Sequence, residues 1–311
     1  MTTTAPRLGV GVVGTGRVGA VLGSALRAAG HPVVGVSAVS RQSRERADAL
    51  LPGVPVLDTD EVVRRAELVL LTVPDDALAP LVAGLGELGA WQMGQLVVHT
   101  AGRFGVDVLA PATAAGAIGL ALHPAMMFTG TSLDLARLEA TTFAVTAAGP
   151  FAPIGQALVV ELGGEPVLVA EEHRGLYHAA LAHGANHLVV LVAQAAQALA
   201  AAGVADAGTA LRPLLEVALD SALRQASPPG APAGEPRAGA IAALTGPVRR
   251  ADVAAITHHL AELTAWACRT GAVDQVAAYR VMARSATVRA LAAGLVTATQ
   301  AEQLLEELEE R

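Results

Sequence analysis

The feature that most constrains the fold of this chain is a glycine-rich run near its start, Gly14-Thr15-Gly16-Arg17-Val18-Gly19. The run follows an apolar segment and opens a helical pattern, which is the context of a strand–turn–helix unit. At this spacing Gly14 makes the tight turn, Gly16 lets the backbone approach a pyrophosphate, and Gly19 lets the helix pack closely on the strand. The N–H groups at the start of the helix then face the anion. The run therefore predicts a dinucleotide-binding turn, with a purely structural glycine-rich turn as the alternative.

Short apolar runs alternate with helical stretches up to about residue 170. We expect strands at residues 8–13, 33–38, 54–56, 68–73, 96–99, 117–122, 142–145 and 167–169. We expect helices at residues 17–29, 43–50, 75–88 and 150–162, and a short helix after Asp58, whose spacing to Glu61 resembles a capping box. Strands separated by helical crossovers predict an α/β fold with a doubly wound, mostly parallel sheet.

The second part of the sequence is helical. Helices are expected at residues 174–202, 207–226, 250–268, 273–291 and 299–310, with a Pro-rich loop at residues 227–236. We therefore predict a Rossmann domain over residues 1–170 and an all-helical domain over residues 171–311, which would bind substrate and form a homodimer. The apolar segment 188–204 is too short and too weakly apolar for a membrane span, so we expect a buried helix of a soluble protein and no membrane partner.

Composition excludes several functional classes. All 21 basic residues are arginine and none is lysine, so Schiff-base chemistry, a phosphate-loop lysine and a lysine general acid are excluded. The single cysteine, Cys268, excludes an intrachain disulfide and a cysteine-cluster zinc site. The net charge of −7 does not favour a nucleic-acid partner. The first residues lack the apolar core of a secretory signal, which predicts a cytoplasmic protein.

The end of the second expected strand indicates which dinucleotide binds. An NAD site usually places Asp or Glu there, on the ribose 2′-hydroxyl. This chain has no carboxylate before Glu45 and offers Ser40, Arg41 and Arg44 instead. Hydroxyl and guanidinium groups suit a 2′-phosphate, so we predict NADP as the cofactor, with an ordinary surface loop as the alternative.

The ends of three later strands complete the expected cofactor groove and substrate site. Ligands of a doubly wound sheet lie across the carboxyl ends of its strands. We therefore expect Thr72, Val73 and Pro74 to line the cofactor, and the nicotinamide and substrate to meet at His99. His123 ends the next strand and is a candidate catalytic residue, although a histidine at a strand end can equally be structural.

The first long helix of the second part interrupts its apolar pattern with Tyr177, His178, His183, Asn186 and His187. His183 and His187 are one turn apart, a spacing that can bind a metal, but no third ligand is evident and we predict no metal site. We expect these polar groups to face the cleft between the domains, with buried helix packing as the alternative. His178 is the candidate proton donor or orienting group, and Asn186 the candidate hydrogen-bond partner of the substrate.

Several segments together resemble one family of bacterial Rossmann-like proteins with an appended helical domain of unknown function. They are the glycine-rich run, the Ser-Arg loop, VPDDAL (73–78), HTAG (99–102), LHPAMMF (122–128), YHAALAHGAN (177–186) and LTGPVRRAD (244–252). The resemblance covers nearly the whole chain and implies polar site residues at His99, His123, His178, Asn186 and Thr245. The chain is similar, more distantly, to pyrroline-5-carboxylate reductases and β-hydroxyacid dehydrogenases. Some proteins of this general type are 2-dehydropantoate reductases.

Two departures from these relatives bear on the chemistry. The 2-dehydropantoate reductases and β-hydroxyacid dehydrogenases use a lysine one turn before an asparagine on the first long helix, whereas this chain has Ala182 before Asn186. If the chemistry is similar, His178, His183 or water would replace that acid. Ala125 also interrupts the His-Pro-Met segment that prephenate dehydrogenases carry.

The residues and the resemblance together predict an NADPH-dependent reductase that transfers a hydride to a small 2-keto acid, with 2-dehydropantoate as the first choice. Arg249 and Arg250 are expected to clamp the substrate carboxylate, or else to form a solvated basic pair. The alternatives are an imine reductase of the pyrroline-5-carboxylate type, a prephenate-type dehydrogenase, and a non-catalytic NADP-binding protein.

Overall fold

The computed structural model describes residues 7–139, 141–226 and 238–309 of the chain. The chain divides into two compact units, which we call the sheet unit (Met1–Asn186) and the helical unit (His187–Arg311). The predicted domain limit near residue 170 lies just before α8 (Arg174–Ala201), and the division between the units falls inside that helix. The first turns of α8 therefore belong to the sheet unit.

A seven-stranded sheet forms the centre of the sheet unit, in the order β2-β1-β3-β4-β5-β6-β7. Its strands are β1 (Val10–Val13), β2 (Val33–Ser37), β3 (Leu68–Leu71), β4 (Leu96–His99), β5 (Ile118–Pro124), β6 (Thr142–Ala147) and β7 (Glu165–Leu168). All neighbouring strands are parallel except β5 and β6. The chain passes from β1 to β2 on one side and returns to β3 on the other, so the strand order reverses at β1, where doubly wound sheets bind ligands. The predicted fold class is confirmed.

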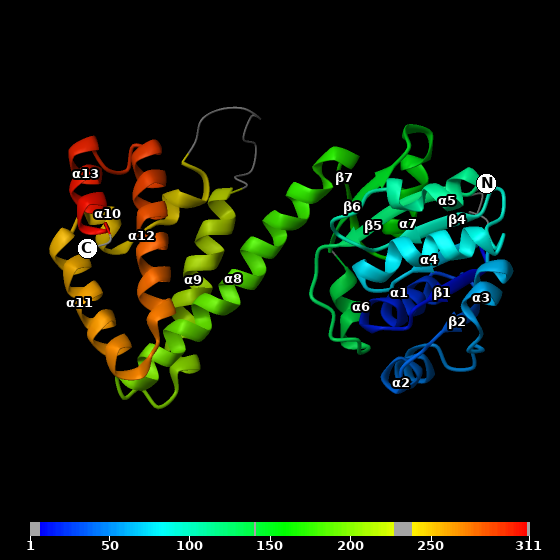
Figure 1. The fold of residues 1–311 in the computed structure, drawn as a ribbon, viewed down its shortest axis with the longest axis horizontal. Coiled ribbons are helices and arrows are strands. Elements are labelled where there is room, and N and C mark those ends of the chain that lie inside the picture. The colour runs from blue at the N-terminus through cyan, green and yellow to red at the C-terminus, as the bar shows by residue number, and fades with distance from the viewer. Residues whose placement is uncertain (1–6, 140, 227–237, 310–311) are drawn as a thin grey trace. The chain divides into compact units, whose positions relative to one another are not determined.

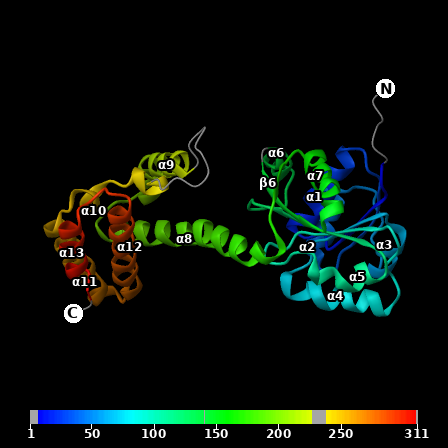
Figure 2. The same ribbon diagram turned by 90° about the horizontal axis from the view of Figure 1, so that it is seen from above.

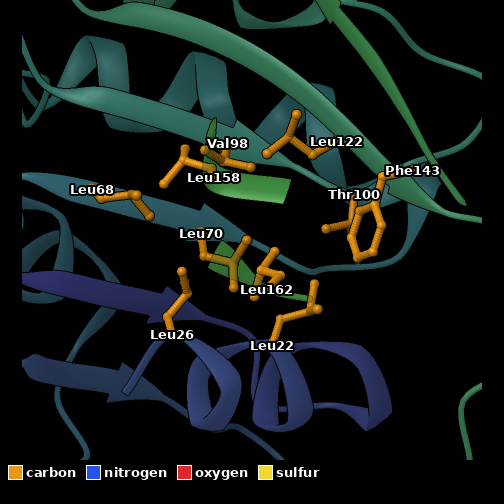
Figure 3. A pocket seen from close by; sticks show the side chains of 10 residues that line it. All are labelled: Leu22, Leu26, Leu68, Leu70, Val98, Thr100, Leu122, Phe143, Leu158 and Leu162. Atoms are coloured by element: carbon orange, nitrogen blue, oxygen red, sulfur yellow. The ribbon is translucent and has the colours of Figure 1, made fainter. Parts of the chain in front are cut away.

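Helices cover both faces of the sheet (Figure 1, Figure 2). One face carries α1 (Arg17–Ala28), α2 (Arg41–Leu50), α6 (Leu133–Leu138) and α7 (Ala152–Glu161), and the other carries α3 (Thr59–Arg65), α4 (Asp75–Glu87) and α5 (Ala110–Ala114). Strand side chains alternate between the two cores, so Val12 packs in the first and Val13 in the second. Figure 3 shows part of the first core, where ten side chains, all apolar except Thr100, leave a void of about 10 Å³. A void of this size is an ordinary packing defect of the core and is too small for a ligand.

Some short elements differ from the sequence expectations. Residues 54–56 add no strand to the sheet, because Val56 makes only an isolated bridge to Val36 and Pro55 has no N–H with which to extend the ladder. Asp58 is the N-cap residue of α3, but its side chain makes no capping hydrogen bond, so the expected capping box does not form. The helices α5, α6 and α10 (Gly246–Arg250) were not anticipated, since five or six residues carry too little periodicity to predict a helix.

The helical unit contains the remainder of α8, followed by α9 (Ala207–Ala226), α10, α11 (Val253–Thr270), α12 (Val273–Ala292) and α13 (Ala298–Glu307). Its main core packs α11, α12 and α13 together through Ile256, Leu260, Ala283 and Leu304. The described part of this unit forms only helices and connecting turns, which confirms the predicted helical region. The expected Pro-rich loop at residues 227–236 lies outside the described residues.

Helix α8 is exposed along the segment that we expected to be buried. Among the described residues, Glu171–Ala201 is the one helical stretch long and apolar enough to cross a membrane, and none of its most apolar window is buried within the chain. Val189 is 59% and Val190 50% exposed. The expectation of a buried helix is therefore wrong for the single chain. The helix is apolar on all sides, and the rest of the chain does not cover all of those sides.

Candidate active site

The turn between β1 and α1 has the shape of a phosphate-binding turn. Gly14 has a φ of +91°, which residues with side chains rarely adopt, and a Cβ on Gly19 would overlap the carbonyl oxygen of Gly14 and the side chain of Thr72. A Cβ on Gly16, the N-cap residue of α1, would meet no atom within 4 Å. Gly14 and Gly19 therefore shape the turn, whereas Gly16 leaves open space where the N–H groups of α1 begin.

Two threonines predicted to line the cofactor make hydrogen bonds that stabilise this turn. Thr15 is fully buried, and its hydroxyl oxygen lies 3.2 Å from the carbonyl oxygen of Ser37 and 3.1 Å from that of Ser43. The hydroxyl of Thr72 donates to the carbonyl oxygen of Gly14 at 2.5 Å. Their side chains therefore stabilise the turn.

The other predicted groove residues near this turn are partly or fully exposed. Arg17 is exposed at the first position of α1, next to Gly130, and Val18 is half-buried against the first core. Val73 is half-buried and Pro74 exposed in the turn from β3 into α4. Since β1 and β3 are parallel neighbours, these residues lie at one edge of the sheet, as predicted.

The loop after β2 presents hydroxyl and guanidinium groups at the start of α2. Ser40 is the N-cap residue, and its side chain caps the helix. The side chain of Arg41 is 92% exposed, and its Nε donates to a carboxylate oxygen of Glu45 at 2.7 Å. Arg44 donates from Nε to the carbonyl oxygen of Ala38 at 3.3 Å. An exposed ion pair on one helix is easily exchanged, so Arg41 can turn toward an anion at this helix start.

His99 ends β4 and is fully buried. Its Nε2 donates to the carbonyl oxygen of Gly105 at 2.7 Å, and its Nδ1 accepts the N–H of Ala101 at 3.2 Å. Burial, together with the charge of Arg174, lowers the pKa of His99 to about 4, although the hydrogen bond to Gly105 opposes the shift. Both ring nitrogens are occupied within the chain, so the His99 side chain shapes the loop after β4 and has no nitrogen to offer a nicotinamide.

His123, Tyr177 and His178 form a cluster at the end of β5. The Nδ1 of His123 lies 2.9 Å from the hydroxyl oxygen of Tyr177. The His123 ring packs edge-on against the rings of Tyr177 and His178, at centroid distances of 5.6 and 6.1 Å. Gly102 brings the loop after β4 against both imidazoles, since a Cβ there would lie 2.5 Å from Cδ2 of His178 and 2.9 Å from Nε2 of His123. Only glycine fits this close approach.

A cavity of about 270 Å³ lies beside the cluster, within the sheet unit. It is lined by His123, Ala125, Met126, Met127, His178, Leu181, Ala182, Ala185 and Asn186. The three predicted catalytic residues, His123, His178 and Asn186, therefore share one cavity of a size suited to a small molecule.

The protonation states of the His123–Tyr177 pair follow from its surroundings. Burial, then the charge of Arg174 and the neighbouring imidazoles, lower the pKa of His123 to about 4, so its ring is neutral at neutral pH. Burial raises the pKa of the Tyr177 hydroxyl, with Arg174 opposing, so the hydroxyl keeps its proton. The hydroxyl of Tyr177 therefore donates to the neutral imidazole.

Arg174 is the residue of this region that sequence reasoning missed. Its side chain is 1% exposed, and Nε, Nη1 and Nη2 are buried without a hydrogen-bond partner. Its guanidinium carbon lies 5.9 Å from the ring centroid of Tyr177. Burial lowers the pKa of Arg174, while Tyr177 and Glu171 oppose that shift. Arg174 is the first residue of α8, where its positive charge is unfavourable next to the positive end of the helix dipole. This unfavourable placement is the sequence signal that could have identified Arg174 as a functional residue.

The predicted carboxylate clamp lies in the helical unit and has partners there. Arg249 donates from Nη1 to the carbonyl oxygen of Leu295 at 2.7 Å, and Arg250 lies 4.0 Å from the carboxylate of Asp252. Thr245 is the exposed N-cap residue of α10. These contacts resemble the solvated basic pair that was the alternative interpretation.

His183 and His187, the pair with metal-binding spacing, are exposed on α8. Across residues 7–139, 141–226 and 238–309, no three or more His, Cys, Asp or Glu side chains are grouped so as to hold a metal ion.

Comparisons with known proteins agree with this architecture. The Rossmann-like domain family matches residues 2–124, and a domain of unknown function, DUF2520, matches residues 141–286. A comparison with the curated proteins finds no match.

Solved structures share the fold over most of the chain. A Bacteroides fragilis protein provisionally assigned as an NADP oxidoreductase is 22% identical, with a TM-score of 0.67 over 90% of this chain and 98% of its own. Imine reductases from Pseudomonas sp. and, as a variant with NAD+, from Myxococcus stipitatus are 18% and 19% identical. Their TM-scores are 0.64 and 0.59, over 98% and 96% of this chain and 100% of each relative. At these identities the likeness shows a shared fold, and with the family matches it confirms the resemblance: the chain combines a Rossmann-like domain with a C-terminal helical domain of the DUF2520 type.

Proposed function

We propose that the protein is an NADPH-dependent oxidoreductase that reduces the C=O or C=N carbon of a small acid. The observation that carries the proposal is the turn at residues 14–19, which leaves the start of α1 open at Gly16. Because β1, β3, β4 and β5 are consecutive parallel strands, this turn and the cavity at His123 lie at the same edge of the sheet. The structural relatives support the proposal, since they include a protein assigned to NADP and two imine reductases.

The residues at this edge fit a phosphorylated dinucleotide. The open N-terminus of α1 would hold the pyrophosphate, and Ser40, Arg41 and Arg44 at the start of α2 would hold the 2′-phosphate. When bound, the cofactor supplies the hydride.

The chain's own polar groups would position the substrate and deliver a proton. His178 lines the cavity and is the proposed proton donor. Asn186 lines the same cavity, and its amide can hydrogen-bond a substrate oxygen. His123 is neutral and accepts a hydrogen bond from Tyr177, so this pair orients polar groups and does not supply an imidazolium proton.

We infer a small 2-keto acid as the substrate, with 2-dehydropantoate as the first compound to test. A cyclic imine is the second candidate, and a specific observation favours it. The chain has no lysine, and the pKa of His123 is too low for a charged imidazole at neutral pH. A substrate that arrives already protonated, as an iminium ion does, needs no strong acid from the protein.

Oxidation of NADPH in the presence of two panels tests the proposal. One panel contains 2-keto acids, including 2-dehydropantoate, and the other contains cyclic imines, including pyrroline-5-carboxylate. Turnover of keto acids supports the first candidate, and turnover restricted to imines selects the second. NADPH binding without oxidation by either panel would indicate a non-catalytic protein, and absence of NADPH binding would contradict the proposal as a whole.

We also infer that two copies associate through the helical unit as a cytoplasmic homodimer. Apolar side chains that are at least half exposed occur on three of its helices: Val189, Val190, Leu214, Val217, Leu223, Val273, Val281 and Val288. So much exposed apolar surface favours association. The net charge of −7 disfavours an anionic membrane surface as the partner, whereas a second copy presents the same apolar surface and can cover it.

Light scattering tests the dimer. The expected mass is twice the 31.3 kDa of one chain. The double variant Leu214→Glu with Val217→Glu should become monomeric. Leu88→Glu, at an exposed position of the sheet unit, is the matched control and should remain dimeric. A monomeric wild-type protein, or one that sediments with membranes, would contradict this inference.

A further inference from the structure

A buried positive charge without a partner lies next to the histidine cluster. Arg174 is 1% exposed, and its three guanidinium nitrogens have no hydrogen-bond partner in the described structure. A guanidinium carries five N–H donors and remains charged in proteins. Leaving such a group buried and unpaired is strongly unfavourable, so its presence calls for a partner that the chain itself does not provide.

The carboxylate of Glu171, which favours the charged form of Arg174, already accepts hydrogen bonds from the backbone. Its oxygens accept the N–H of Val106 at 2.7 Å and that of Asp107 at 3.3 Å. A Cβ on Gly105 would overlap the Glu171 carboxylate, so this carboxylate packs directly on the loop after β4. Glu171 therefore secures that loop and leaves the N–H donors of Arg174 unpaired.

Arg174 lies close enough to the cavity to act on a ligand there. Its guanidinium carbon is 5.9 Å from the ring centroid of Tyr177, whose hydroxyl contacts His123 on the cavity wall. The charge of Arg174 also acts on both His99 and His123. The guanidinium nitrogens are closed off from solvent in this structure, so an anion can pair with them only if a neighbouring group, such as the ring of Tyr177, moves aside.

We propose that Arg174 binds the carboxylate of a small 2-oxo acid or cyclic imino acid that enters the cavity beside His123. A planar carboxylate accepts two parallel N–H bonds from one guanidinium, which neutralises the buried charge. The inference rests on the proposed function and narrows it, because neutral ketones and neutral imines would then bind poorly. It also moves the role of carboxylate clamp from Arg249 and Arg250 to Arg174.

Calorimetric titration of the full-length protein with oxamate, an unreactive analogue of a 2-oxo acid, tests the proposal, with and without NADP+. The uncharged methyl ester of oxamate is the matched ligand and should bind at least about tenfold more weakly. Arg174→Met should weaken oxamate binding by about 10–100-fold and leave NADPH affinity unchanged. Arg174→Lys should retain part of the oxamate affinity. Arg174→Met should also raise the thermal midpoint, because it removes an unpaired buried charge.

Equal oxamate affinity in the wild type and in Arg174→Met would overturn the inference, and so would a wild type that binds the acid and the ester equally or binds neither. If Arg174→Met does not fold, the comparison of acid and ester on the wild type still decides. Failure of the wild type to bind NADPH would contradict the proposed function instead, and the titration without cofactor would still report on Arg174.

Discussion

The hydroxyl oxygen of Tyr177 lies 2.9 Å from Nδ1 of His123, and this contact joins the first turns of α8 to the end of β5. Burial and nearby positive charge keep His123 neutral, so the hydroxyl donates and the imidazole accepts. The pair therefore fixes the His123 ring, against which His178 packs edge-on. The cavity wall thus carries one histidine whose orientation is set by the chain and a second that can act on a ligand.

Replacing His178 tests the assignment of the proton donor. His178→Ala should lower turnover by about 10²–10⁴-fold, the usual contribution of general acid catalysis, and leave NADPH affinity unchanged. Steady-state kinetics and an NADPH titration measure the two effects. His183→Ala, at an exposed position on the same helix, is the matched control. A loss in His183→Ala without a loss in His178→Ala would transfer the role to His183, and no loss in either would favour the imine substrate.

Removing the Tyr177 hydroxyl separates orientation from proton donation. Tyr177→Phe keeps the ring and deletes the hydrogen bond to His123, so turnover should fall by about 2–10-fold, the scale of one neutral hydrogen bond. The pH dependence of turnover should keep its shape if Tyr177 only positions His123. A loss as large as that in His178→Ala, with a changed pH profile, would make Tyr177 the proton donor.

Gly16 and Gly19 form a matched pair in the turn after β1. Gly16→Val places its side chain in open space at the start of α1, so the fold should persist while NADPH affinity falls by more than about tenfold. Gly19→Ala forces its Cβ onto the backbone of Gly14, so it should lower the free energy of unfolding by about 1–3 kcal/mol. Thermal unfolding and NADPH titration separate the two. Normal NADPH affinity in Gly16→Val would show that this turn does not bind the dinucleotide.

Arg41 should determine the choice between NADPH and NADH. Arg41→Ala should weaken NADPH binding by about 1.5–3 kcal/mol, the scale of a hydrogen bond to a charged group, and leave NADH binding nearly unchanged. Arg65→Ala is the control, because Arg65 also makes an exposed ion pair with a glutamate one turn away, Glu61 on α3. Equal affinity of the wild type for the two cofactors would contradict the prediction of NADP.

The sheet and the position of the cofactor turn could be predicted because they depend on local patterns. An apolar run, a glycine spacing and a following helix occur within the first 30 residues, and parallel topology then places every strand end at one edge. The orientation of individual side chains could not be predicted in the same way. Thr15 follows the strand expected at residues 8–13 and Thr72 lies near the end of the strand expected at residues 68–73, but the two hydroxyls bond to the carbonyl oxygens of Ser37, at the end of β2, and of Gly14.

The polar cluster was only partly predictable, for a related reason. His123 was evident because it ends an expected strand, and His178 because it interrupts an apolar helix. The role of Arg174 depends on the loop after β4 and on the end of β5, which are separated from it by about 50 residues or more of sequence. No periodic pattern in the sequence indicates that the loop around Gly102 contacts residues of α8. The burial of Arg174 could therefore be found only from the structure.

Acid should destabilise the sheet unit because His99 and His123 are neutral when folded. The pKa of His99 is lowered from 6.5 to about 4, first by burial. Between these values the unfolded chain binds a proton that the folded chain does not, so stability is complete above pH 6.5 and is lost as pH falls toward about 4. A shift of this size corresponds to about 3 kcal/mol for His99. His123 acts in the same direction.

Urea unfolding followed by tryptophan fluorescence measures this loss of stability, provided that the fluorescence comes from the sheet unit alone. In a Trp266→Phe background, the buried Trp91 reports on the sheet unit alone. The midpoint should fall between neutral pH and about pH 4.5. His99→Gln should lower the midpoint at neutral pH through lost packing, but it should make the fall with acid smaller, because one titrating group has gone. Leu88→Gln, at an exposed position of the sheet unit, removes no titrating group and is the control, so it should keep the wild-type dependence. An identical pH dependence in His99→Gln and in the wild type would show that His99 is not the group whose protonation destabilises the fold.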